Sequence, residues 1–299
     1  MAYRIKRGDR SAQSSLRRIA REQIERATRA ADDPATDADD AIHDIRKRCK
    51  KIRALLRLVG PHLSVDHDEN AAFRAIARPL GAARDADVLV DTFDRIAVHD
   101  GAEVQADILA PIRSLLVRRR TVLIERIDTR ALLVAARSEL LEAQARVAGW
   151  RLRASGFDAF GAGVEVGFRR ARKAMRKAHA DPSAEAFHAW RKRCKDHAYH
   201  LRLLRPLWPG PMRAMGACAA ELGELLGDHH DLAVLDDTVR DAAGELDAPA
   251  VDLMAALIHA RQEALARKAF PQGARLFADK PSALAARWRR RYDVWRNGA

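Results

Sequence analysis

The chain has 299 residues, of which 48% are apolar, and this composition excludes a disordered chain because it supplies enough material for a buried core. Its formal net charge is +13, and a field of that sign attracts nucleic acid, anionic membrane surfaces or condensed phosphates. No apolar run reaches membrane-spanning length and the first residues lack the apolar core of a signal peptide, so we expect a soluble, cytoplasmic protein that binds no membrane.

Helix-forming residues dominate the chain, aromatic residues make up only 5%, and we find no convincing strand pattern. In chain order, apolar periodicity and Pro or Gly breaks predict helices at residues 11–30, 41–58, 68–78, 84–97, 103–127, 129–148, 167–178, 186–203, 212–226, 249–269 and 282–296. A glycine-rich connecting segment at 150–166 separates an N-terminal half, 1–149, from a C-terminal half, 167–299. The predicted fold class is all-α, with two pseudo-symmetric antiparallel helical bundles.

Two blocks of the sequence occur twice at nearly the same offset. Residues 41–58 and 186–203 are identical at ten of eighteen aligned positions, including the run RKRCK. Residues 80–92 and 226–238 are identical at seven of thirteen positions. Internal duplication is the economical explanation of both repeats.

Each copy of the first block divides into two faces on a helical wheel. Cys49 and Cys194 lie on the apolar faces, and we expect these two cysteines and Cys218 to be reduced and buried. The opposite faces are basic. We name them the first ladder, His43, Arg46, Lys47, Lys50, Arg53 and Arg57, and the second ladder, His188, Arg191, Lys192, Lys195, Tyr199 and Arg202.

The ladders have a structural interpretation and a functional one. Solvated helix faces are commonly rich in Lys and Arg, but they usually mix the two signs of charge. The ladders instead place like charges three, four and seven residues apart, where neighbouring cations repel each other. We therefore favour a polyanion that relieves the repulsion, bound in a groove that both ladders share.

The histidines of the duplicated block leave two alternatives open. His43 and His188 are in the first turn of each ladder helix, where an imidazole caps the helix or donates to a phosphate oxygen. His197 falls on the apolar face, and we interpret it as a core histidine with its hydrogen bonds satisfied.

The sequence gives little support to catalysis or to a metal site. His229, His230 and Asp231 suggest the His and Asp ligands of a metal-dependent phosphohydrolase, but the duplicated equivalents of the two histidines are Ala83 and Arg84. An arginine at a ligand position would repel a metal ion. No phosphate-binding loop, nucleophile elbow or HExxH motif is present. We expect no enzyme activity, metal or cofactor, and keep the phosphohydrolase as an alternative.

These features resemble the conserved histidine α-helical domain family, the CHAD domain. The likeness lies in residues 41–47 and 186–193, in the run LLGDHHDLAVL at 225–235 and in the basic helix at 169–178. The resemblance implies a helical, internally duplicated fold that binds inorganic polyphosphate in a basic groove between its halves. It also implies an adaptor or a protein associated with polyphosphate granules.

The resemblance implies a set of polyphosphate-binding residues. Its main members are His43, Arg46, Lys47, Lys50, Arg53, Arg57, His188, Arg191, Lys192, Lys195 and Arg202, with weaker candidates at Arg17, Arg21, Arg169, Lys173 and Arg176. The position of Arg53 is occupied by Ala198 in the second copy, so the two walls of the groove would differ in strength. The triphosphate hydrolase that accompanies some family members has an ExExK strand, which is missing here.

A nucleic-acid-binding helical protein is the first alternative. Such a protein would place aromatic side chains among its basic residues as stacking platforms for bases. In the second ladder helix, 186–203, Tyr199 is the aromatic residue on the basic face, while Trp190 falls on the apolar face. A flexible chain of phosphates offers repeated charge without base edges, which suits Arg and Lys, so we favour polyphosphate or another phosphate-rich polyanion.

Overall fold

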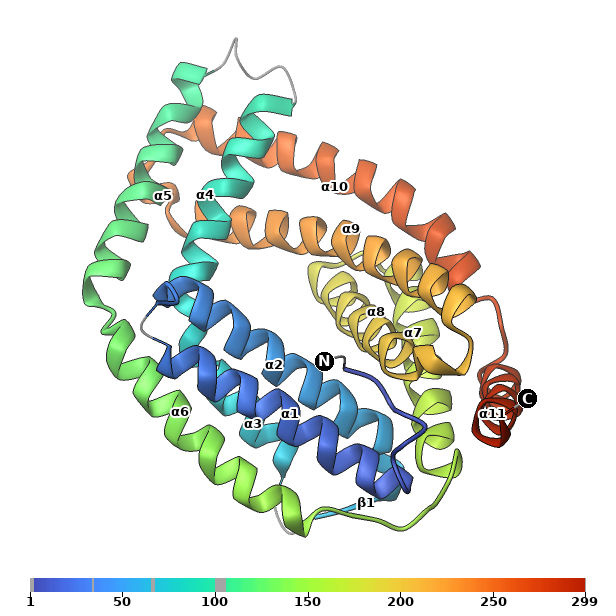
Figure 1. The fold of residues 1–299 in the computed structure, drawn as a ribbon. Helices are drawn as coiled ribbons and strands as arrows, with labels where there is room; N and C mark the ends of the chain where they lie inside the picture. The colour runs from blue at the N-terminus through green and yellow to red at the C-terminus, as the bar shows by residue number, and fades with distance from the viewer. Residues whose placement is uncertain (1–2, 34, 66–67, 100–105, 299) are drawn as a thin grey trace.

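A computed structural model of the protein describes residues 3–33, 35–65, 68–99 and 106–298 (Figure 1). The predicted all-α class is confirmed. The helices are α1 (Ala12–Asp32), α2 (Ala38–Val59), α3 (Glu69–Ala77), α4 (Ala82–His99), α5 (Ala106–Arg126), α6 (Thr129–Arg146), α7 (Asp158–Ala180), α8 (Ala184–Leu204), α9 (Pro209–Asp241), α10 (Ala248–Leu276) and α11 (Pro281–Asn297).

Short 3-10 turns and one small strand pair connect the helices. The turns are η1 (Gly60–His62), η2 (Pro79–Gly81), η4 (Val147–Gly149), η5 (Arg205–Leu207) and η6 (Ala243–Glu245). The expectation of an entirely strand-free chain is wrong in one place, because β1 (Leu63–Ser64) pairs antiparallel with β2 (Arg151–Leu152). This pair ties the end of η1 to the start of the central segment.

The two ladder helices begin and end in similar ways. Asp37 caps α2 by accepting a hydrogen bond from the amide of Asp39, and Ser183 caps α8 by accepting one from the amide of Ala186. Each helix runs into a 3-10 turn that contains a proline, η1 after α2 and η5 after α8. Because proline has no amide hydrogen, it favours the end of the α-helix at this point.

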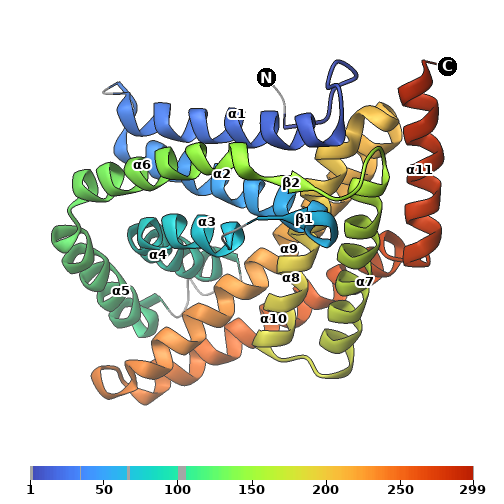
Figure 2. The same cartoon turned by 90° about the horizontal axis from the view of Figure 1, so that it is seen from below.

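The hydrophobic interior does not divide at the boundary between the predicted halves. The larger core runs from Tyr3 to Trp288 and includes side chains of α1, α2, α7 and α8. A second core joins Phe93 and Ile112 of α4 and α5 to Leu232 and Met254 of α9 and α10. Helices from both halves therefore share each core, and Figure 2 shows α1 and α6 on one side of the molecule with α10 opposite.

Three expectations from the sequence need correction. The connecting segment predicted at 150–166 is helical from residue 158 onward, where α7 begins. Cys49 and Cys194 are buried free thiols as predicted, but Cys218 is exposed, so the prediction that all three are buried is wrong. His197 is buried, but its Nε2 has no hydrogen-bond partner in the described structure. Burial lowers the pKa of His197 to about 3, so its ring packs as a neutral aromatic group.

The glycines of the central segment bring two helices together. A Cβ atom at Gly163 in α7 would lie 1.6 Å from the carbonyl oxygen of Leu58 in α2. This close approach of α7 to α2 requires the absence of a side chain at that position. The glycine-rich composition that suggests a linker therefore marks a tight helix–helix contact.

Gly163→Ala should lower the free energy of unfolding by about 3 kcal/mol or more, because the new methyl group meets backbone that must move away. Urea unfolding followed by circular dichroism would measure the loss. The matched control is Gly216→Ala in α9, whose added Cβ would lie 3.9 Å from Leu201. That variant should gain about 1 kcal/mol from higher helix propensity, and equal effects of the two substitutions would show that the α2–α7 contact is not tight.

Candidate functional site

The two ladder helices, α2 and α8, pack directly against each other (Figure 1). Two polar contacts cross the interface near their C-terminal ends. The Nε2–H group of His200 donates to the carbonyl oxygen of Ala54 at 3.1 Å, and Nη2 of Arg57 donates to Oδ1 of Asp196 at 2.5 Å. Asp196 is only 8% exposed, so this ion pair helps to fix the alignment of the two helices.

One arginine of each ladder lies against a glycine of the second duplicated block. Arg46 donates from Nη1 to the carbonyl oxygen of Leu80 at 3.0 Å and pairs with Asp85 at 3.3 Å. A Cβ atom at Gly81 would lie 3.0 Å from Nη1 of the same arginine. Backbone and carboxylate therefore fix the orientation of the Arg46 guanidinium group.

The matching arginine of the second ladder has an equivalent environment. A Cβ atom at Gly227 would lie 3.6 Å from Nε of Arg191. Arg191 and Asp231 also interact electrostatically, and the arginine counteracts the rise that burial causes in the pKa of the aspartate. Gly227 and Asp231 are the duplicated equivalents of Gly81 and Asp85, so each ladder arginine meets the same two residue types.

The lysines of the ladders have no carboxylate close enough for an ion pair within the described residues. Lys47, Lys50, Lys192 and Lys195 make no contact of 4.0 Å or less to an acidic side chain there. The main charged neighbours of Lys50, Lys192 and Lys195 are other cations. Lys50 of α2 interacts electrostatically with Arg46 and with Arg191 of α8.

Two of these lysines combine access to solvent with desolvation by the surrounding protein. Lys50 is exposed to solvent, yet desolvation by the surrounding protein, followed by the nearby arginines, lowers its pKa. Desolvation and the charges of Arg191 and Lys50 lower the pKa of Lys195 to about 8. Both amines therefore lie in surroundings that disfavour their charged form.

The positive surface extends onto two helices outside the ladders. Arg74 of α3 interacts electrostatically with Arg53 and with Lys192, and after desolvation it contributes to the lowered pKa of both. Arg84 of α4 lies near His43 and, after desolvation and Lys47, contributes to the lowered pKa of that histidine. Neither arginine was among the predicted site residues. The signal for Arg84 was its place in the duplicated block, whereas no repeat marks Arg74.

The histidine of the second ladder has an aromatic partner on α9. The ring centroids of His188 and His230 are 4.1 Å apart at an angle of 34°. Desolvation and then Lys192 lower the pKa of His188, and desolvation and then His188 lower the pKa of His230 to about 4. The sequence connects His230 only with a metal site, whereas the structure places its ring beside the cationic side chains of the second ladder.

We name the side chains that these contacts and electrostatic interactions connect the basic cluster. Its members are His43, Arg46, Lys47, Lys50, Arg53, Arg74, Arg84, His188, Arg191, Lys192, Lys195 and His230. The cluster joins α2, α3, α4, α8 and α9, so it contains helices from both halves of the sequence.

Several predicted site residues lie outside the basic cluster. Arg57 adjoins the cluster as a charged neighbour of Arg53, but its guanidinium group forms the ion pair with Asp196 and it also lines a concavity of about 530 Å³ beside η1. Arg202 interacts electrostatically with Tyr3 and Tyr199. Arg169, Lys173 and Arg176 are exposed on α7, and Arg169 pairs with Glu165 of the same helix.

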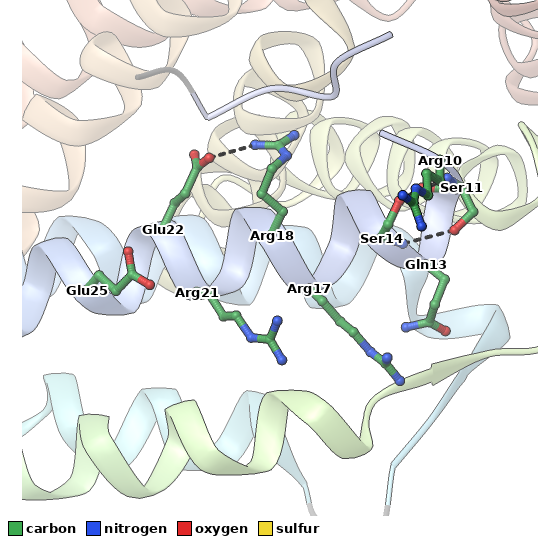
Figure 3. Close-up of a pocket in the computed structure, with 9 residues that line it drawn as sticks. All are labelled: Arg10, Ser11, Gln13, Ser14, Arg17, Arg18, Arg21, Glu22 and Glu25. Carbon is green, nitrogen blue, oxygen red and sulfur yellow. Dashed lines mark hydrogen bonds and ion pairs between the residues drawn. The ribbon is translucent and has the colours of Figure 1, made fainter. Parts of the chain in front are cut away.

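Arg17 and Arg21 lie on α1, along a separate concavity of about 520 Å³ (Figure 3). Both point to one side of the helix, away from the Arg18–Glu22 ion pair. Arg17 donates to the carbonyl oxygen of Trp150 at 2.8 Å and 3.1 Å, which gives it a structural role. Their part in ligand binding stays a prediction.

Among the described residues, no group of three or more His, Cys, Asp and Glu side chains is placed to hold a metal ion. The same part of the chain contains no helix with the length and apolar character needed to cross a membrane.

The amine of Lys195 should titrate near pH 8, and Asp231→Asn should lower that pKa further because the aspartate favours the charged amine. Reductive ¹³C-methylation followed by NMR titration would measure it, with Lys195→Arg to assign the resonance. Asp85→Asn is the matched control, since Asp85 favours the charged form of Lys50. Titration of Lys195 at its ordinary value of 10.5 would mean that its surroundings are neither desolvated nor cationic.

Comparison with known proteins assigns the chain to a family. The sequence profile of the CHAD domain matches residues 15–240. The "Uncharacterized protein MT2285" of Mycobacterium tuberculosis (strain CDC 1551 / Oshkosh) and the "Uncharacterized protein Rv2226" of strain ATCC 25618 / H37Rv are each 32% identical to this chain over 258 residues. Each alignment covers 73% of this chain, which spans 44% of the length of these relatives.

The fold agrees with a solved structure of the same domain. The crystal structure of the CHAD domain from the plant Ricinus communis superimposes with a TM-score of 0.52 at 19% sequence identity, covering 91% of this chain and 89% of that one. The resemblance inferred from the ladders and the duplicated blocks is therefore confirmed at the level of the family: the chain belongs to the CHAD domain family.

Proposed function

We propose that this protein binds inorganic polyphosphate at the basic cluster and does so without catalysis. The observation that carries the proposal is the arrangement of the four ladder lysines. They belong to two packed helices, and no acidic side chain of the described residues pairs with them. The main charged neighbours of Lys50, Lys192 and Lys195 are cations. A bound polyanion would supply the missing negative charge.

The chemistry of the basic cluster suits a chain of phosphates. Lysine amines act as point charges for phosphate oxygens, and arginine guanidinium groups donate two parallel hydrogen bonds. The Leu80 carbonyl and Asp85 orient the guanidinium group of Arg46, whereas no ion pair within the described residues holds the lysines. This combination favours a ligand with repeated charge over one with a single fixed shape.

The duplicated contacts support a groove that both halves of the sequence share. Arg46 with Gly81 and Arg191 with Gly227 place equivalent side chains against equivalent helices. We propose that the two halves arose by duplication and that the ligand lies along α2 and α8. The walls would differ in strength, because Arg53 of the first ladder corresponds to Ala198 in the second.

The nucleic-acid alternative has less support from the arrangement of aromatic side chains. Trp190 is fully buried and stacks on Phe270, and Tyr199 is half-buried against Tyr3. Neither ring is free to stack on a base. Phosphate charge without bases therefore fits the basic cluster better than single-stranded nucleic acid.

The absence of catalysis is also part of the proposal. The basic cluster contains no carboxylate or thiol that stands beside a base in the manner of an activated nucleophile. Its function would be to hold polyphosphate as an adaptor or at polyphosphate granules. Sustained release of free phosphate from polyphosphate in the presence of Mg²⁺, Mn²⁺ or Zn²⁺ would contradict the proposal and favour the metal-dependent phosphohydrolase.

Lys47→Glu combined with Lys192→Glu should weaken binding of long-chain polyphosphate by about 3 kcal/mol, roughly 100-fold in Kd, because two charged hydrogen-bond donors are lost. Fluorescence anisotropy of labelled polyphosphate would measure the change, and the salt dependence of Kd should become shallower. The matched control, Lys268→Glu with Lys280→Glu, makes the same change in net charge on exposed positions of α10 and beside α11. Equal losses in both variants would mean that diffuse charge does the binding.

Single-stranded DNA at the same phosphate concentration should fail to displace labelled polyphosphate, since the basic cluster offers charge but no platform for bases. Unlabelled polyphosphate is the control competitor and should displace the label fully. If DNA and polyphosphate compete equally, specificity for phosphate chains is wrong and the nucleic-acid alternative gains support.

A further inference from the structure

The basic cluster has two walls: the first contains His43 of α2 and Arg84 of α4, and the second contains His188 of α8 and His230 of α9. The second wall ends in a pair of histidines, and the first wall has no such pair. His188 of α8 and His230 of α9 have ring centroids 4.1 Å apart. Their duplicated equivalents are His43 and Arg84. The first wall therefore places an imidazole near a permanently charged guanidinium group, whereas the second places two titratable rings in contact.

The ring of His188 lacks a partner that its protonated form needs. An imidazolium donates from both nitrogens, but Nδ1 of His188 is buried without a hydrogen-bond partner in the described structure. The main charged side chains that act on the pair are Arg191 and Lys192, both cations of α8. A phosphate oxygen near the pair would supply an acceptor and a compensating negative charge.

The acidic residues of α9 near the pair are engaged elsewhere. Asp228 pairs with Arg95 of α4 at 3.2 Å, and Asp231 interacts with Arg191 and Arg95. On the side of α10, Gln262 donates to the backbone carbonyl of His229 at 3.2 Å. The ring of His229 is buried and stacks on Phe187 with centroids 3.8 Å apart.

We propose that the His188–His230 pair couples polyphosphate binding to proton uptake, so that acidification strengthens the second wall while Arg84 keeps the first wall charged at every pH. The inference rests on the proposed function and deepens it by assigning a regulation to the same site. The two walls then act differently: the first combines one titratable ring, His43, with the permanent charge of Arg84, and the second gains charge at two rings as the pH falls.

The sign of the effect follows from linkage. Desolvation and neighbouring cations lower the pKa of both histidines in the free protein, that of His230 to about 4. A bound polyanion stabilises the imidazolium forms and raises both values. Affinity therefore rises as pH falls below the pKa of the bound state, by up to about tenfold per pH unit for each proton taken up, and levels off below the pKa of the free protein. This window lies below the titration of Lys195 near pH 8.

The test measures Kd from about pH 7.5 to about pH 5.5 at constant ionic strength. Long-chain polyphosphate is used because its terminal phosphate groups, which titrate in this range, are few. Calorimetry in buffers of different ionisation enthalpy counts the protons taken up. Wild-type protein should bind at least roughly tenfold more tightly at the acidic end. The double variant His188→Gln, His230→Gln should lose most of that slope, and His259→Gln, an exposed histidine of α10, should keep it.

His230→Arg supplies a gain-of-function test, because it copies the first wall. It should bind more tightly than wild type near pH 7.5 and depend less on pH. Circular dichroism at each pH checks that every variant is folded. If wild-type protein binds at every pH but the double variant keeps the full slope, the histidine pair is not the coupling element. If wild-type protein does not bind polyphosphate at any pH, the proposed function itself is wrong.

Discussion

The site depends on holding two cationic helix faces next to each other despite their repulsion. The pKa of Lys195 falls from 10.5 to about 8 in its desolvated, cationic surroundings, which corresponds to an unfavourable free energy on the order of 3 kcal/mol for the charged amine. The packing of α2 and α8 must outweigh this cost. Ile45, Ile52, Trp190 and Leu201 are fully buried on the opposite faces of these helices, and each of the three aliphatic side chains contributes about 1.5–3 kcal/mol.

The same packing keeps the cationic side chains close together, so that a bound anion can relieve their repulsion. The Arg57–Asp196 ion pair and the His200–Ala54 hydrogen bond cross the α2–α8 interface at the end of the ladders, and Gly163 holds α7 against α2. These contacts prevent the helices from separating to relieve the charge. The remaining means of relief are deprotonation of the lysines and histidines or the arrival of an anion. A preorganised cationic surface of this kind needs little rearrangement when it binds.

The helices, the two ladders and the family of the chain could be predicted from the sequence, because these depend on local periodicity and on repeats. The sequence did not predict how the halves combine. Arg17 and Arg21 share the charge and helical setting of the ladders, but their helix packs so that they lie along a different concavity. Arg74 carries no repeat signal and joins the basic cluster only because α3 folds back against α2. The glycines of 150–166 predict a connecting segment by composition, while the effect of Gly163 depends on Leu58, more than 100 residues earlier.

The two walls of the basic cluster combine residues that are the same in both copies of the repeated sequence with residues that differ. Two copies of one sequence block can keep the residues that fix local geometry and still differ in the residues that fix charge. Here Gly81 and Gly227, with Asp85 and Asp231, are the same in both copies, and each glycine lies against one ladder arginine. Arg84 and His230 differ at one position beside them. A single substitution between equivalent positions thus changes a permanent charge into one that responds to pH, without altering the packing on which both walls rely.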